Sequence, residues 1–184
     1  MDKEALRKLA EAAVQCERET GYPAEVILAQ AALETGWLRS VHGNNLFGIK
    51  YSPLRGGGRQ LLRTSEWFTE EEAERWLHGM EGRQILSVGD YVDPRGKRLY
   101  RVRDWFVVYP DLASSMRDYV RLVTSGRYAG AWRRYLKDKD IKGLVRGIAD
   151  AGYSTRKNYA DLVLGVLTPE VMDAIRAARG QAGR

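Results

Sequence analysis

The sequence predicts an α+β fold, because helical segments at both ends of the chain flank a short region of strands. The patterns of residues 3–35 and 111–179 are typical of helices, with glycine, proline and capping residues at their expected ends. Residues 85–109 are instead typical of strands, which surround a turn at residues 93–96. A chain of 184 residues is long enough for a core of its own, so we expect a single domain over residues 1–184.

The first two elements are predicted to be helices over residues 3–20 and 23–35. Gly21 is expected to end the first helix, since glycine readily adopts the left-handed conformation found after helix ends. Pro23 fits the first turn of the second helix, where its missing N–H has no partner to lose. Cys16 is the only cysteine, and we expect it to be a buried apolar residue of the first helix.

The second helix carries apolar side chains on almost every side, which is typical of a buried helix. Its long polar side chains are Glu25, Gln30 and Glu34, and the last two share one face because they lie four residues apart. Gly36 is expected to end the helix, and Trp37 follows it. A carboxylate at the end of a buried helix is costly unless it is paired, hydrogen-bonded or used in chemistry, so we expect Glu34 at the lip of a cleft.

A glycine-rich loop over residues 39–59 leads into the β region and is expected to carry function or to form a mobile lip of the site. Residues 60–67 follow as a short strand. Thr69 and Glu72 then form a capping box, in which each side chain accepts a hydrogen bond from the backbone N–H of the other. This motif predicts a helix over residues 70–80.

Further strands are predicted at residues 85–88, 91–92 and 98–109, with Asp93 in the turn between the last two. The rest of the chain is predicted to be helical. The helices are expected near residues 111–124, 127–137, 140–151, 156–167 and 169–179. The tail, residues 180–184, is expected to fray.

The chain carries 30 lysine and arginine residues against 24 aspartate and glutamate residues, and its net charge of +6 favours an anionic partner. Nucleic acid, a membrane and an anionic polymer such as a bacterial wall all fit this charge, and a basic surface that only aids solubility is the alternative. No helix-turn-helix, zinc-finger or Walker motif supports nucleic acid as that partner. No apolar run reaches the ~20 residues of a membrane span. With one cysteine and the isolated His42 and His78, no metal, disulfide or cofactor is expected.

Two carboxylates are candidates for acid–base chemistry. Burial raises the pKa of a carboxyl group, as a general acid working near neutral pH requires, and its apolar surroundings make Glu34 the first candidate. Glu66 is the second candidate and lies in an extended stretch before the capped helix. The simpler interpretation is that it is an ordinary charged residue at the end of a strand. Tyr153 and Tyr159 bracket a polar loop, so they are either hydrogen-bond donors to a ligand or packing residues at a helix entrance.

Residues 29–50, AQAALETGWLRSVHGNNLFGIK, resemble the signature of the glucosaminidase domain of glycoside hydrolase family 73, which occurs in bacterial autolysins. Further segments resemble weaker motifs of that family in the same order, namely Thr64–Trp67, Asp104–Pro110 and Ala151–Ala160. The resemblance covers residues 5–168. It implies a lysozyme-like fold, in which a cleft separates a mainly helical lobe from a small β lobe.

The resemblance implies that the substrate is peptidoglycan, cut after N-acetylglucosamine, and that Glu34 is the general acid. Glu66 matches the second carboxylate of the family, and Tyr159, or alternatively Tyr153, matches a tyrosine that lines the cleft. Side-chain amides, aromatic rings and one further carboxylate are expected to bind the substrate. These residues are Gln30, Trp37, Asn44, Asn45, Phe47, Tyr153 and Asp90.

The chain departs from the family pattern in the β lobe. Residues 67–98 are longer than the usual hairpin and include the capped helix, so the lobe, near residues 60–109, is expected to be enlarged by an insertion. We expect this insertion to extend the cleft without supplying the acid. A second alignment places residues 89–93 at the hairpin, and Asp90 then replaces Glu66 as the second carboxylate.

Three functions follow as alternatives from the sequence. The first is an endo-β-N-acetylglucosaminidase, whose inverting, retaining or substrate-assisted route depends on the geometry of its carboxylates. The second is a lytic transglycosylase or muramidase-like wall lysin with one acid, and the third is an inactive wall-binding module. We expect a monomer that acts at the bacterial wall. The N-terminus lacks a signal-peptide pattern, so we expect release as for a phage endolysin, a special export route, or excision from a longer secreted protein.

Overall fold

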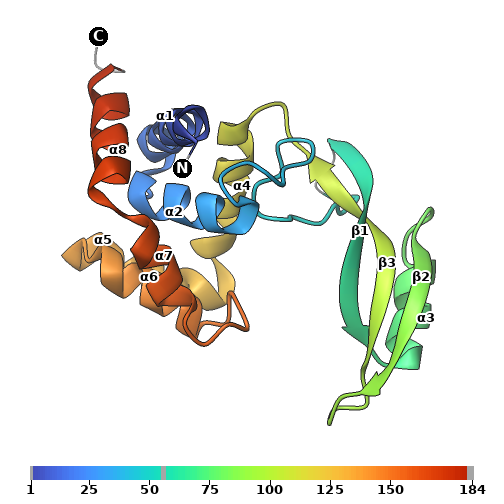
Figure 1. Cartoon of the computed structure of the whole chain (residues 1–184). Coiled ribbons are helices and arrows are strands. Elements are labelled where there is room, and N and C mark those ends of the chain that lie inside the picture. Colours follow the sequence, from blue (N-terminus) through green and yellow to red (C-terminus); the bar gives the residue numbers. More distant parts are fainter. Residues whose placement is uncertain (1, 55–56, 182–184) are drawn as a thin grey trace. The chain divides into compact units, whose positions relative to one another are not determined.

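The computed structural model describes residues 2–54 and 57–181. The chain divides into two compact units, one formed by Met1–Phe47 and Tyr109–Arg184 and the other by Gly48–Val108 (Figure 1). The described part of the first contains helices, and that of the second contains a sheet and a helix, so we call them the helical unit and the sheet unit. Helices at both ends of the chain with strands between them confirm the predicted α+β class.

Two glycines end the first two helices, as the sequence predicts. Helix α1 (Lys3–Thr20) ends at Gly21, with a φ of 73°, and helix α2 (Ala24–Thr35) ends at Gly36, with a φ of 57°. Glycine adopts this left-handed conformation without the steric penalty of a Cβ atom. Pro23 is the N-cap of α2 rather than a residue of its first turn, and it supplies no side-chain cap.

The other helices of the helical unit follow in the predicted order. They are α4 (Leu112–Val123), the 3₁₀ turn η1 (Gly126–Tyr128), α5 (Ala129–Asp138), α6 (Ile141–Asp150), α7 (Tyr159–Val166) and α8 (Pro169–Gln181). α7 begins at Tyr159 instead of residue 156 as predicted. Gly180 belongs to α8 and is not frayed, and residues 182–184 of the expected tail lie outside the described residues.

Helix α2 lies at the centre of the helical unit. It packs against α1, α6, α7 and α8, while α1 also packs against α4 and α8 (Figure 1). All residues of α2 except Leu33 and Glu34 are buried. The prediction that this apolar helix is buried is therefore confirmed, and Cys16 on α1 is buried as expected.

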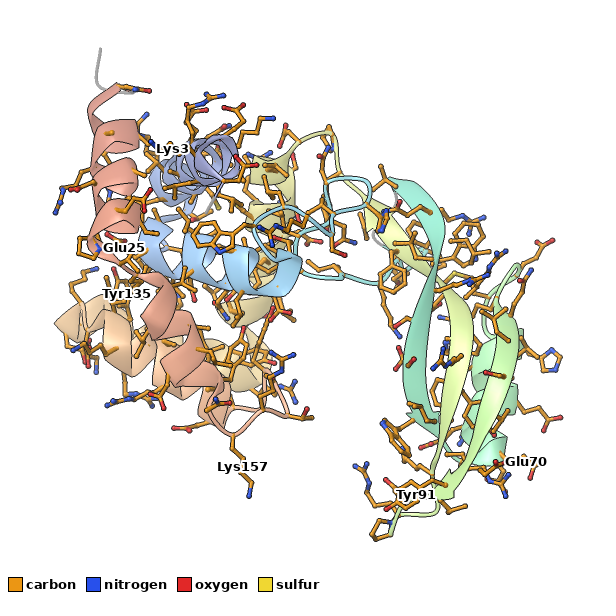
Figure 2. All side chains as sticks on the ribbon, in the orientation of Figure 1. Lys3, Glu25, Glu70, Tyr91, Tyr135 and Lys157 are labelled. Atoms are coloured by element: carbon orange, nitrogen blue, oxygen red, sulfur yellow. The ribbon has the colours of Figure 1, made fainter. Side chains whose placement is uncertain are left out.

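A cluster of charges joins α8 to the first two helices. The guanidinium of Arg179 lies 2.6 Å from the carboxylate of Glu17 on α1 and 2.8 Å from that of Glu25 on α2. Glu17 also accepts a hydrogen bond from the Ala24 N–H, at 2.9 Å, and so caps α2. Burial raises the pKa of Glu17, but hydrogen bonds from Arg179 and from the Ala24 N–H outweigh it and hold the pKa below its ordinary value. Figure 2 shows Glu25 and Tyr135 on the same side of the helical unit.

Replacing Arg179 by Met is expected to lower the free energy of unfolding by about 2 kcal/mol, because it leaves the buried carboxylate of Glu25 without its partner. Part of this loss depends on pH. The folded-state pKa of Glu17 lies below 4.5, so the stability from this shift is present above 4.5 and is lost as the pH falls through the folded value. Urea unfolding of both proteins, at neutral pH and in acid, measures the two effects.

The matched control for this prediction is Arg176→Met. Arg176 lies on the same helix but is exposed, and its guanidinium pairs with the exposed Asp173. Exposed pairs of this kind contribute about 0–1 kcal/mol, so this variant should remain close to the wild type. Equal losses in the two variants would show that the Arg179 cluster does not join the helices as we describe.

The sheet unit holds a three-stranded antiparallel sheet in the order β1-β3-β2. Its strands are β1 (Gly58–Phe68), β2 (Gln84–Val92) and β3 (Arg98–Val108). β1 extends beyond the predicted residues 60–67 because it pairs with β3 along its whole length. β2 joins the predicted segments 85–88 and 91–92 into one strand, with irregular pairing to β3 between Val88 and Val92.

Helix α3 (Glu70–His78) lies against one face of this sheet (Figure 1). Its predicted capping box is present. The Glu72 N–H donates to the Thr69 hydroxyl at 3.2 Å, and the Thr69 N–H donates to the Glu72 carboxylate at 2.8 Å. An apolar cluster joins α3 to the sheet. Its members are Ala73, Tyr100, Val102, Phe68, Trp76 and Ile85. The helix ends at His78, short of the predicted residue 80.

Candidate active site

Glu34 lies in the last turn of α2, directly before the chain changes direction. Gly36, Trp37 and Leu38 have φ angles of 57°, 62° and 65°. This left-handed conformation costs a non-glycine residue about 1–2 kcal/mol. The turn is held by a hydrogen bond from the Leu38 N–H to the Thr35 hydroxyl at 3.0 Å. Since backbone strain of this kind is concentrated at functional sites, the end of α2 is a candidate site.

The side chain of Glu34 is exposed, which corrects the expectation of a buried carboxyl group. The reason is its place on the helix. α2 is buried along almost all of its length, but Glu34 lies at the end, where the chain leaves the core. The carboxylate is therefore accessible to a ligand, while the helix that carries it is anchored in the interior.

Three buried side chains connect Glu34 to the core of the helical unit. The Tyr119 hydroxyl donates to the side-chain carbonyl oxygen of Gln30. The Gln30 amide nitrogen donates to the Tyr159 hydroxyl at 3.0 Å, and that hydroxyl donates to Oε1 of Glu34 at 3.1 Å. Gln30 is 1% exposed and Tyr159 2% exposed, so neither can exchange these partners for water. We call this chain of hydrogen bonds, from Tyr119 to Glu34, the tyrosine relay.

The direction of each hydrogen bond in the tyrosine relay follows from its first member. Because Tyr119 donates to the carbonyl oxygen of Gln30, the amide nitrogen of Gln30 is directed at Tyr159. The Tyr159 hydroxyl accepts that bond, which leaves its own proton for Glu34. Burial raises the pKa of both Tyr119 and Tyr159, so each hydroxyl keeps its proton and acts as a donor.

Aromatic rings surround the tyrosine relay. The ring of Phe47 stacks on Tyr119 with centroids 4.1 Å apart. Tyr153 lies 5.9 Å from Tyr119 and 5.5 Å from Tyr159, and burial raises its pKa well above the ordinary value. Tyr22 packs edge-on against Tyr119, at 6.3 Å, and its hydroxyl is buried there without a bond to Gln30 or Tyr159. Phe47 and Tyr153 are half-buried, so both rings reach the surface beside the relay.

The loop before the sheet unit is held by its two asparagines and by the start of α4. The Asn44 side-chain amide donates to the Tyr109 carbonyl at 2.9 Å, and the Leu46 N–H donates to the Ser115 hydroxyl at 3.0 Å. Asn45 is buried. These contacts hold the loop in place, so the amides that the sequence assigned to substrate binding also have structural partners.

Gln30 requires a similar revision. The sequence places it on the same helical face as Glu34 and assigns it to substrate binding. The structure buries it between two tyrosine hydroxyls, with both ends of its amide occupied. It therefore acts on the site through Tyr159 rather than from a surface position. Trp37 stays a candidate for direct contact with a ligand, because it is half-buried.

In the sheet unit, Glu66 lies on β1 and forms an ion pair with Lys50. The Lys50 ammonium also lies 3.1 Å from Asp104, a fully buried residue of β3 that is paired with Arg83 at 2.8 Å. Burial raises the pKa of Asp104, but hydrogen bonds from Arg83 and Lys50 outweigh it and hold the pKa below its ordinary value. Glu66 is thus placed beside a cation that Asp104 holds in position.

The residues that hold Glu66 in place were not identified from the sequence. One signal was available in the spacing of residues along the strand. Asp104 lies on the same face of β3 as Tyr100, Val102 and Phe106, and all of them are buried. Aspartate is uncommon in strands, and a buried one needs a charged partner. The identity of that partner, Lys50, depends on the isolated bridge that this residue forms with Phe106.

Asp90, the alternative second carboxylate, has different surroundings. It is exposed on β2, in the segment where pairing with β3 is irregular. No hydrogen bond or ion pair joins it to another of the described residues. The structure therefore gives Glu66 a defined charged environment and gives Asp90 none.

The described residues offer neither a metal-binding cluster nor a helix that could cross a membrane. Within residues 2–54 and 57–181, no group of three or more His, Cys, Asp and Glu side chains is arranged to hold a metal ion. Over the same residues, none of the helices combines the length and the apolar character that crossing a membrane requires. The chemistry considered below uses only the side chains of the chain itself.

The glucosaminidase family model, described as mannosyl-glycoprotein endo-beta-N-acetylglucosaminidase, matches residues 10–168 of the chain. The peptidoglycan hydrolase FlgJ of Vibrio parahaemolyticus is 31% identical over 153 residues, which cover 79% of this chain and 40% of that relative. FlgJ of Escherichia coli K12 is 29% identical over 166 residues, which cover 86% of this chain and 43% of that relative. The chain thus spans less than half the length of these relatives.

Solved structures share the fold. The glycoside hydrolase domain of Salmonella typhimurium FlgJ matches with a TM-score of 0.65 and 22% identity, over 100% of this chain and 97% of that one. The catalytic domain of the autolysin Auto from Listeria monocytogenes matches with a TM-score of 0.61 and 21% identity, over 95% of this chain and 85% of that one. These likenesses confirm the lysozyme-like α+β fold that the resemblance implied.

Proposed function

The chain belongs to the glucosaminidase family, and from this we propose that it hydrolyses peptidoglycan as an endo-β-N-acetylglucosaminidase, with Glu34 as the general acid. The observation that carries the proposal is the hydrogen bond from Tyr159 to Glu34 at the exposed end of a buried helix. It places an accessible carboxyl group in a fixed orientation, which general acid catalysis requires. The bond cut is the one that follows N-acetylglucosamine, and the site of action is the bacterial wall.

In this mechanism the protonated Glu34 transfers its proton to the glycosidic oxygen. The bond from the sugar C1 to that oxygen breaks, the leaving oxygen keeps the electron pair, and positive charge develops at C1. Tyr159 donates to Oε1 of Glu34, so Oε2 is the oxygen that carries the transferable proton. The same hydrogen bond stabilises the carboxylate that remains after the transfer.

We propose Glu66 as the second carboxylate, which stabilises the charge at C1 or activates the attacking water. Its ion pair with Lys50, which also pairs with Asp104, supports this role, because it holds the carboxylate in a defined position as a base or nucleophile requires. Asp90 is the alternative, and it lacks such a cluster. Trp37, Phe47 and Tyr153 are proposed to contact the sugars, since half-buried rings can stack on the apolar face of a sugar.

Mass spectrometry of peptidoglycan digested by the purified chain tests this proposal. A new reducing end at N-acetylglucosamine is the expected product. An anhydro-muramic end would instead assign the chain as a lytic transglycosylase, and the absence of any cleavage would indicate a wall-binding module. Either of these two results would overturn the proposed activity.

The tyrosine relay leads to a prediction about a residue that is fully buried. Replacing Tyr119 by Phe removes the donor that orients the Gln30 amide, so Tyr159 loses its fixed direction toward Glu34. We expect kcat to fall by about tenfold with little change in KM, since the lost interaction positions the acid rather than the substrate.

Tyr22→Phe is the matched control. Tyr22 packs against Tyr119 in the same core, but its hydroxyl bonds neither Gln30 nor Tyr159. Removing it should leave kcat unchanged, since the side chains that direct the Gln30 amide and the Tyr159 hydroxyl stay in place. If the two variants lose activity equally, the relay does not position Glu34. The same conclusion follows if Tyr119→Phe lowers stability but leaves kcat unchanged.

A further inference from the structure

The face of the sheet that does not contact α3 carries four arginines, of which Arg63, Arg101 and Arg103 lie together near the middle of the strands. Residues directly opposite each other in an antiparallel pair lie on the same face, and the faces alternate along each strand. Arg63 on β1 is opposite Arg103 on β3, and Ser65 is opposite Arg101. Val102 lies between the two arginines of β3 and belongs to the apolar cluster that joins α3 to the sheet. It therefore points to the opposite face. We call the face with Arg63, Arg101 and Arg103 the arginine face.

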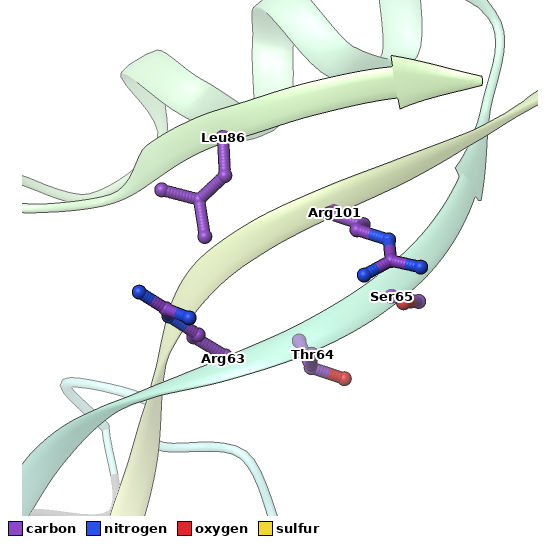
Figure 3. Close-up of a pocket in the computed structure, with 5 residues that line it drawn as sticks. All are labelled: Arg63, Thr64, Ser65, Leu86 and Arg101. Carbon is purple, nitrogen blue, oxygen red and sulfur yellow. The ribbon is translucent and has the colours of Figure 1, made fainter.

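Figure 3 shows a shallow cavity on the arginine face. It has a volume of about 360 Å³ and is lined by Arg63, Thr64, Ser65, Leu86 and Arg101. The Leu86 side chain extends from β2 toward Arg63, and the guanidinium of Arg101 lies over β1 near Ser65 (Figure 3). Arg63 and Arg101 are exposed. The cavity therefore combines two accessible guanidinium groups, a hydroxyl and an apolar wall.

The charge of the arginine face is not compensated within the described part of the chain. None of the arginines Arg63, Arg101 and Arg103 forms an ion pair with a carboxylate there, whereas four acidic residues of the sheet unit pair elsewhere. Glu66 and Asp104 pair with Lys50, Glu72 pairs with Lys97, and Asp93 pairs with Arg95. Like charges directly opposite each other in a sheet are destabilising, so the pair Arg63 and Arg103 has a cost that folding does not explain.

Exposed aromatic rings continue this surface toward the β2–β3 turn. Trp67 is opposite Leu99, in the same alternation as Ser65, and is 40% exposed. Its ring meets that of Tyr91 edge-on, with centroids 6.2 Å apart, and Tyr91 is 66% exposed (Figure 2). A ligand with anionic groups separated by small apolar groups would match the order of arginines, leucine and rings on this surface.

We propose that the arginine face binds the carboxylates of the peptides carried by the peptidoglycan glycan, an inference that rests on the proposed function. The planar guanidinium group forms two parallel hydrogen bonds with a carboxylate. Leu86 and the two exposed rings then contact the apolar side chains between the carboxylates. A phosphodiester polymer offers anions without such apolar groups, so the peptide fits the arginine face better. The chain thus holds its substrate by the peptides as well as by the sugars.

The test compares glycan strands that carry their peptides with strands from which an amidase has removed them. In the variant with Arg63→Gln and Arg101→Gln, we expect the Kd for peptide-bearing strands and the KM for their cleavage to rise by about tenfold or more. The Kd for peptide-free strands, and kcat on both substrates, should stay at wild-type values. The variant is expected to fold, because it removes like charges from an exposed face, and thermal unfolding checks this.

The matched control is Lys142→Gln with Arg146→Gln on α6. Both residues are exposed, and the variant loses the same charge from another surface. It should bind both kinds of strand like the wild type. A loss of binding equal to that of the arginine-face variant would mean that net charge alone attracts the wall, and would overturn the proposal.

Two further results would also overturn it. One is an arginine-face variant that binds both kinds of strand as the wild type does. The other concerns whole walls. If the arginine-face variant binds whole walls more weakly than the wild type, but the two bind equally after acid has removed the phosphodiester polymers, the face binds those polymers. If the wild type binds peptide-bearing strands through this face but cleaves neither substrate, the proposed hydrolase activity fails while the peptide site stands.

Discussion

Replacing Glu34 by Gln is expected to lower wall lysis by at least about 100-fold, the usual contribution of a general acid. Glutamine has the shape of glutamic acid and can accept the hydrogen bond from Tyr159, but it has no proton to transfer to the glycosidic oxygen. The loss should appear in kcat, because the proton is transferred only in the transition state. Turbidity loss of purified walls, with mass spectrometry of the released fragments, measures it.

The effect should be specific to this position. Glu11→Gln on α1 is a suitable control, because Glu11 is exposed on the same unit and forms its ion pair with the neighbouring Arg7. That variant should lyse walls at the wild-type rate. Since Glu34 is itself exposed, Glu34→Gln should unfold at the same temperature as the wild type. A folded Glu34→Gln protein with near-normal activity would exclude Glu34 as the acid.

Glu66→Gln is expected to reduce kcat by about 10–100-fold, and Asp90→Asn to change it by less than about twofold. The reason is the environment of each group. Glu66 lies beside Lys50, which also pairs with the buried Asp104, so its carboxylate is held in one position beside a cation. Asp90 lies exposed on an irregular part of β2 with no described partner. The comparison must be made at equal folded fraction.

Glu66→Gln also breaks an ion pair, so its stability needs a control of its own. Lys50 keeps its contact with Asp104 in this variant, and exposed pairs contribute about 0–1 kcal/mol, so the loss of stability should be small. If Asp90→Asn proves the more damaging change, the second alignment is correct and the second carboxylate lies on β2. Equal and small effects would indicate a route in which the acetamide of the substrate replaces a second carboxylate.

Local features of the sequence were sufficient for most of the helix boundaries. Gly21 and Gly36 ended α1 and α2 as predicted, and Thr69 with Glu72 placed the start of α3. These signals depend on residues within one or two turns of each other, so no distant contact is needed to read them. The burial of α2 was also predictable, because a helix that is apolar on all sides has no face to offer to water.

The strands were predicted less well, and the reason is again physical. β1 continues beyond residues 60–67 because β3 pairs with its ends, and β2 bridges the gap at residues 89–90. Strand length is decided by the partner strand, which lies far away in the sequence. The arginine face has the same origin, because only the register brings Arg63 opposite Arg103.

The sequence by itself determined the family, the α+β class and the burial of α2, and it singled out Glu34 as the candidate acid. The tertiary structure decided what surrounds that carboxylate. It exposed Glu34 at the end of its helix and brought Tyr159, from the other end of the chain, to its carboxylate. It also moved Gln30 from the expected substrate site to the interior. Hydrogen bonds between distant segments depend on how the helices pack, and no local pattern of residues specifies that packing.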